Sequence, residues 1–196
     1  LHLMHRIKNA GCKSKEDVIF TIHKIIDDIL AESTSLTLIG GDVSSEFSIF
    51  ELFVKMLRKL AGSGRRDFVF VLGNHELWDF PGLSVDEIVD KYRTVLKENG
   101  MYLLHNDLFY RNESDDMGII PYDELIQSDN QAILEKLRCT RLVILGGLGF
   151  SGYNEEFNAN DGVYRATVDR NTEIQESKKF EQLYDKLTDV LAKKHT

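Results

Sequence analysis

The chain has 196 residues, of which 42% are hydrophobic, enough to bury a sizeable core. Its net charge of −8 argues against a nucleic-acid partner, because such proteins carry a large basic surface. No apolar run reaches the length of a membrane span, so no membrane partner is expected. Cys12 and Cys139 form neither a disulfide framework nor a zinc pattern, which favours a reducing, cytoplasmic location.

Helix and strand patterns alternate through the first 72 residues. Apolar residues at helical or strand spacing predict a helix, a strand, a second helix and a second strand: 15–30, 36–39, 47–60 and 68–72. Ser14 is the expected cap of the first helix, and Ser44 or Ser45 that of the second. The uninterrupted β-branched and aromatic residues of 68–72 are typical of a strand covered on both faces.

The alternation continues in the rest of the chain. A capping box at Ser84 predicts a third helix that ends at Gly100. Short strands at 101–104 and 108–110 are separated by turn-forming residues, so we expect them to pair as a hairpin. A short helix, a buried strand, a long loop and a final helix should follow: 129–137, 141–145, 150–164 and 180–191. One α/β domain over residues 1–196 is the simplest account of this order.

Polar side chains follow two of the predicted strands. Gly40-Gly41-Asp42 comes after the first strand, and Gly73-Asn74-His75-Glu76 comes after the second. The carboxyl ends of neighbouring parallel strands open into one crevice, where such groups can converge. A carboxylate can bridge two divalent cations, and a carboxamide oxygen can complete a coordination shell without adding charge. The alternative is structural, with Asp42 capping the next helix and Asn74 stabilising a turn.

These two motifs, in this order after apolar strands, resemble those of the calcineurin-like metallophosphoesterase superfamily. The resemblance implies a layered α/β sandwich with central β-sheets flanked by helices, and two divalent metal ions, with Mn, Fe or Zn expected. It implies that Asp42 bridges the metals and that Asn74 ligates the second metal. It makes His75 the catalytic residue, as general acid or transition-state donor, and Glu76 a partner that orients the loop.

The chain also departs from the family pattern. The family opens with Asp-x-His, and we expect Leu1-His2 to be the end of such a motif, which would make His2 a ligand of the first metal; the alternative is a disordered terminal histidine. The family's later Gly-His-x-His segment is missing, and Ser45 stands where an Asp often occurs. We therefore expect a fragment, the front half of such a domain, that lacks the first strand and the later histidine motifs and is inactive as printed.

Further polar residues follow the predicted strand 141–145. The glycine-rich stretch 146–152 lacks the lysine of a nucleotide-binding P-loop. Within the resemblance it lies at a strand end, so Tyr153 and Asn154 become candidate substrate-binding residues. His105 is assigned to turn chemistry.

The sequence thus predicts a metal-dependent hydrolase of phosphate mono- or diesters that uses a two-metal mechanism. The alternative is a non-catalytic binding or scaffolding module that keeps the fold without a working metal centre. The phosphoester substrate is the expected partner.

Overall fold

The polypeptide forms two units, each built around its own β-sheet. The computed structural model describes residues 1–62, 66–150, 163–165 and 167–192. One unit comprises Leu1–Leu103 with Asn160–Val168, and the other Leu104–Ala159 with Asp169–Thr196. Parallel and antiparallel sheets flanked by helices confirm the predicted α/β class. That the two units form one domain stays a prediction.

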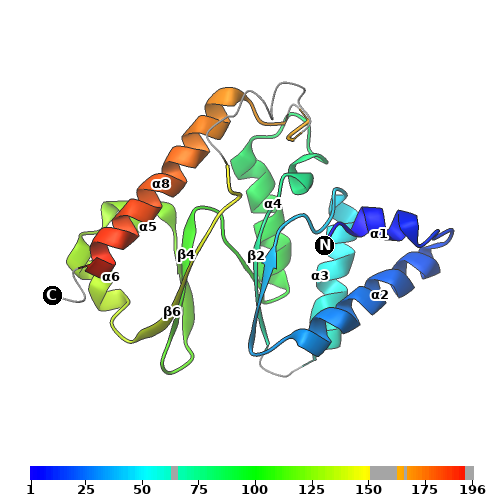
Figure 1. Cartoon of the computed structure of the whole chain (residues 1–196), viewed down its shortest axis with the longest axis horizontal. Helices are drawn as coiled ribbons and strands as arrows, with labels where there is room; N and C mark the ends of the chain where they lie inside the picture. Colours follow the sequence, from blue (N-terminus) through cyan, green and yellow to red (C-terminus); the bar gives the residue numbers. More distant parts are fainter. Residues whose placement is uncertain (63–65, 151–162, 166, 193–196) are drawn as a thin grey trace. The chain divides into compact units, whose positions relative to one another are not determined.

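The first unit contains a parallel sheet with the strand order β1-β2-β3 (Figure 1). Its strands are β1 (Leu36–Gly40), β2 (Asp67–Val71) and β3 (Tyr102–Leu103). Its helices are α1 (Leu3–Asn9), α2 (Lys15–Glu32), α3 (Phe47–Ala61), α4 (Val85–Glu98) and the short 3-10 turn η1 (His75–Leu77). Gly40 pairs with Val71 at the last step of the β1–β2 register. The residues that follow both strands therefore leave the sheet side by side.

Aromatic side chains fill the core beneath these strand ends. Phe68 and Phe70 of β2 are fully buried, and Phe50 of α3 packs edge-on against Phe70 and against Tyr92 of α4. The Tyr92 hydroxyl donates a hydrogen bond of 3.0 Å to the backbone carbonyl of Glu76. Helix α4 is thereby tied to the loop that follows β2, so the core supports that loop directly.

Helix starts agree with the sequence in two cases and differ in a third. Capping boxes begin α2 at Ser14 and α4 at Ser84, as predicted. Helix α3 instead has Glu46 as its N-cap, with no capping bond from that side chain. The Ser44 hydroxyl bonds the backbone of Glu46, so the expectation of a serine cap on α3 was wrong. The sequence also did not indicate α1, whose short pattern holds only two buried residues.

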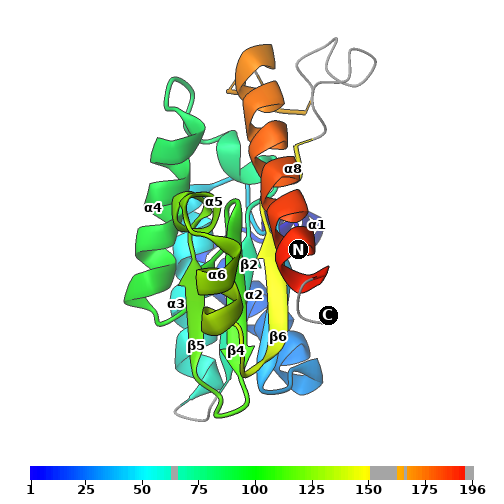
Figure 2. The ribbon, with the colours of Figure 1, turned by 90° about the vertical axis from the view of Figure 1, so that its left-hand side faces the viewer.

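The second unit is an antiparallel sheet with helices over one face. Its strands are β4 (Asp107–Asn112), β5 (Met117–Ile120) and β6 (Thr140–Gly146), in the order β5-β4-β6. Figure 2 shows α5 (Tyr122–Gln127), α6 (Asn130–Lys136) and α8 (Arg170–Ala192) lying over the same face of this sheet. Apolar residues from the sheet and the three helices form its core: Leu108, Ile120, Leu125, Ile133, Leu137, Leu183, Leu187 and Val190.

The predicted hairpin between 101–104 and 108–110 does not form. Strand β3 pairs in parallel with β2, whereas β4 pairs with β5 and β6. The turn chemistry is nevertheless present, since Asn106 has a φ of 55° and the Asp107 carboxylate accepts the His105 backbone N–H at 3.1 Å. Local sequence shows that the chain turns here, but it does not show which strand each side of the turn will join.

Among the residues that the structure describes, no helix is both long and apolar enough to cross a membrane.

Candidate metal centre

Two glycines allow the ends of β1 and β2 to touch. Gly41 has a φ of 81°, and a Cβ on it would come within 2.7 Å of the Gly73 backbone nitrogen. A Cβ on Gly73 would overlap a carboxylate oxygen of Asp42. Neither position tolerates a side chain without displacing backbone or the carboxylate. The glycines at the ends of the two strands are thus required for the close approach that places Asp42 beside His75.

The buried side chain of Glu76 connects the loop that follows β1 to the loop that follows β2. Its side chain is fully buried and accepts four backbone N–H groups: those of Asp42, Val43, Ser44 and Gly73, at 3.1, 2.6, 3.1 and 2.8 Å. Burial raises the pKa of Glu76, and the N–H donors oppose that shift by stabilising the carboxylate. This carboxylate therefore holds both loops in one conformation, and Asp42 with them, although Asp42 has a φ of 49°.

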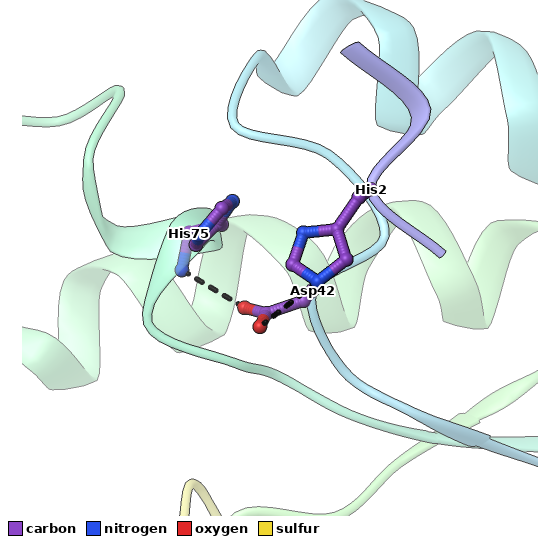
Figure 3. Close-up of side chains that lie close together, drawn as sticks. All are labelled: His2, Asp42 and His75. Carbon is purple, nitrogen blue, oxygen red and sulfur yellow. Dashed lines mark hydrogen bonds and ion pairs between the residues drawn. The ribbon is translucent and has the colours of Figure 1, made fainter. Parts of the chain in front are cut away.

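Three side chains converge above these loops: His2, Asp42 and His75 (Figure 3). One Asp42 oxygen accepts the backbone N–H of His75 at 3.2 Å, and the other lies 3.9 Å from Nε2 of His2. The two imidazole rings are 4.8 Å apart. His2 is placed by its own backbone N–H, which donates to the Asp42 carbonyl at 2.6 Å. The strand ends and the start of the chain thus meet at one point.

These groups form a donor set that suits a divalent transition metal. One carboxylate oxygen and one nitrogen from each ring lie within 4.8 Å of one another. Oxygen and imidazole nitrogen are ligands for zinc, iron and manganese. Asn74 lies in the same loop and donates its amide N–H to the Val163 carbonyl at 2.6 Å. Since the amide nitrogen is used in this way, its oxygen is the atom left for a cation.

His75 is also stacked on an aromatic ring that sequence reasoning did not select. Its imidazole lies 3.8 Å from the centroid of Trp78, with an angle of 28° between the planes. Burial lowers the pKa of His75; Asp42 raises it, and the nearby His2 and Arg165 lower it further. The neutral ring is favoured, and it still carries one N–H to donate. Trp78 is the only tryptophan, three residues after His75, which was the available sequence signal.

The remaining candidates do not join this group. Tyr153 and Asn154 lie outside the described residues, as do the last two residues, 151 and 152, of the glycine-rich stretch. His105 is buried in the second unit, where Nε2 of its ring lies 3.1 Å from the carboxylate of Glu176. Val163 and Arg165 do reach the centre, but no local pattern indicated them, because they are separated from β2 by about 90 residues of sequence.

Comparison with family models then identifies the class. The model for calcineurin-like phosphoesterases matches residues 3–193. The chain belongs to the calcineurin-like phosphoesterase family. No curated protein and no solved structure matched the chain in the corresponding searches. The predicted family resemblance and the α/β class are therefore confirmed, and the family is one of metal-dependent phosphoester hydrolases.

Proposed function

We propose that this calcineurin-like phosphoesterase hydrolyses phosphate mono- or diesters with two divalent cations, Mn, Fe or Zn, held at the ends of β1 and β2. One observation carries the proposal: a carboxylate oxygen of Asp42 and one ring nitrogen each of His2 and His75 lie within 4.8 Å of one another, so a proton donor stands beside two potential metal ligands. The phosphoester substrate is the partner that this chemistry requires.

Each residue has a distinct task in this proposal. Asp42 would be shared by both cations, His2 would hold the first, and the amide oxygen of Asn74 would hold the second. Bound divalent cations would supply an activated water and neutralise charge that develops on the phosphoryl group. His75 donates its ring N–H to the phosphoryl or leaving oxygen, held in orientation by Trp78. Glu76 keeps the two loops together through the backbone N–H groups that it accepts.

The donor count supports a second candidate, a module that binds metal without turnover. Within the described residues, four side chains offer donors at this centre: His2, Asp42, Asn74 and His75. Two cations with four to six ligands each would need waters or further residues to complete their shells.

Metal content and turnover measured on the same sample separate the two candidates. The chain is stripped with a chelator and reloaded with Mn²⁺, its bound metal is counted, and hydrolysis of an aryl phosphate monoester and a methyl aryl diester is followed. Turnover that disappears with the chelator and returns with Mn²⁺ supports the hydrolase. Bound metal without turnover favours the second candidate. Turnover that is indifferent to the chelator would contradict both.

A further inference from the structure

A segment distant in sequence is fixed to the candidate metal centre. The backbone carbonyl of Val163 accepts two side-chain N–H groups, from Asn74 at 2.6 Å and from Trp78 Nε1 at 2.8 Å. Both donors belong to the loop and turn that follow β2. Residues 163–165 are therefore anchored to the same loop that carries His75, and they lie within the first unit.

Trp78 is covered by a different group on each face of its ring. The His75 imidazole is 3.8 Å from the ring centroid, and the Arg165 guanidinium carbon is 3.7 Å from it. Two planar groups so close to one ring centre cannot lie side by side on the same face, because their own widths would overlap. The three side chains thus form a sandwich, in which the indole of Trp78 lies between the imidazole of His75 and the guanidinium of Arg165.

Within the part of the chain that the structure describes, the Arg165 guanidinium forms no ion pair. It is exposed, and among residues in the described ranges no carboxylate lies within ion-pair distance of it. Its backbone has a φ of 50°, a conformation that a non-glycine residue adopts at some cost. Stacking on an aromatic face holds a guanidinium in place and leaves its N–H groups at the edge available to an anion.

We propose that Arg165, held on Trp78, binds the phosphate group of the substrate and makes the centre selective for phosphate monoesters. This inference rests on the proposed two-cation hydrolase. An anion at the edge of the sandwich can accept from His75 on one side of the indole and from Arg165 on the other. Charge-assisted hydrogen bonds are about 2.8 Å long, so a phosphate that accepted from both groups would span the thickness of the indole ring.

The number of unesterified phosphate oxygens determines which substrate class Arg165 would favour. A phosphate diester has two unesterified oxygens, and both are used when they face the two cations of the proposed centre. A monoester has a third, which Arg165 can bind, and it carries more negative charge at neutral pH for the guanidinium to balance. A diester would have only its cation-facing oxygens to offer, so its bond to Arg165 would be weaker.

The lone tryptophan provides a binding assay that does not need turnover. Trp78 fluorescence is titrated first with Mn²⁺, a paramagnetic quencher, and then, at saturating Mn²⁺, with inorganic phosphate and with dimethyl phosphate. Dimethyl phosphate represents a diester, because only two of its oxygens are unesterified. We expect phosphate to bind more tightly than dimethyl phosphate. Arg165→Ala should weaken phosphate binding about tenfold and dimethyl phosphate binding less than twofold.

Two further variants make the assay specific. Arg165→Lys keeps the charge but loses the planar fork, and it should recover part of the phosphate affinity. Arg93→Ala is the matched control, since Arg93 lies on α4 in the same unit and pairs with Asp90 at 2.8 Å; it should bind both anions as the parent chain does.

The outcomes distinguish this inference from the proposed function. Equal phosphate affinity in the parent and in Arg165→Ala would overturn it, as would an absence of phosphate binding to the Mn²⁺-loaded parent. Equal losses for both anions would overturn the monoester preference. Failure of the hydrolase proposal has another signature, namely no Mn²⁺ quenching of Trp78 and no metal-dependent turnover.

Discussion

Each unit contains a histidine–carboxylate cluster, and the two carboxylates differ in how many hydrogen bonds they accept. In the second unit the Glu176 carboxylate accepts from His105 at 3.1 Å, Asn106 at 2.8 Å and Lys179 at 2.6 Å. The His105 and Glu176 side chains are 7% and 6% exposed. The hydrogen bonds at this carboxylate are already made, so the cluster is suited to holding α8 against the turn before β4.

The cluster at the ends of β1 and β2 has the same residue types, but its carboxylate accepts fewer hydrogen bonds. Nε2 of His2 is 3.9 Å from Asp42, beyond hydrogen-bond distance, and the two side chains are 51% and 30% exposed. Asp42 accepts one backbone N–H at 3.2 Å. Its oxygens and the ring nitrogens thus keep coordination capacity. The two clusters thus share residue types and differ in how many hydrogen bonds their carboxylates already accept.

The largest expected effect comes from removing the Asp42 carboxylate, whose oxygens are available to coordinate a metal. Asp42→Ala should weaken Mn²⁺ binding by at least about 100-fold, because it deletes the only carboxylate of the donor set. Mn²⁺ quenching of Trp78 fluorescence measures the change. Asp28→Ala on α2 is the control, since that residue is exposed and outside the cluster. Unchanged Mn²⁺ affinity in Asp42→Ala would show that the open cluster is not the metal centre.

Replacing His75 should separate binding from turnover. His75→Ala is expected to keep most Mn²⁺ affinity and to lower metal-dependent turnover of an aryl phosphate by about 100-fold, the usual contribution of a positioned proton donor. Metal content and kcat are measured on the same preparation. Loss of both together would make His75 a metal ligand, as its distance from the other donors permits.

A smaller effect should follow from adding one methyl group beneath Asp42. Gly73→Ala places a Cβ against the carboxylate oxygen, so Asp42 must shift, and we expect Mn²⁺ affinity to fall about tenfold with a loss of about 1–3 kcal/mol in unfolding free energy. Gly40→Ala is the matched control, because a Cβ there meets nothing within 4 Å. If the two alanine variants behave alike, contact between the strand ends does not control the centre.

The smallest expected effect, at neutral pH, concerns the Glu176 carboxylate of the second unit. Burial opposes ionisation of Glu176, but hydrogen bonds from His105 and Lys179 outweigh it and lower the pKa of Glu176 from 4.5 to about 2. The resulting stabilisation is fully present above about pH 4.5 and is lost as the pH falls towards 2. Glu176→Gln should lower the unfolding free energy by about 1–2 kcal/mol at neutral pH and flatten its decline in acid.

Urea unfolding across that pH range tests the expectation. Glu181→Gln on the exposed face of α8 is the control and should follow the parent curve. A Glu176→Gln variant with the parent's acid dependence would show that the cluster does not stabilise the second unit through an ionised carboxylate.

The sequence by itself determined the elements that local patterns encode. Capping boxes at Ser14 and Ser84 predicted where α2 and α4 begin, because a cap acts over three residues of chain. Apolar strands that end in glycine and polar residues predicted where Asp42 and His75 stand, since parallel strands bring their carboxyl ends to one edge.

Only the tertiary structure decided what depends on distant partners. It paired β3 with β2 instead of β4, used both Glu176 oxygens in hydrogen bonds, and brought Val163 and Arg165 to Trp78. Apart from the Lys179 bond to Glu176, which spans three residues, these outcomes join residues that are far apart along the chain. Sequence periodicity reports which side of an element is buried, whereas the partner that covers it is chosen by packing over the whole unit.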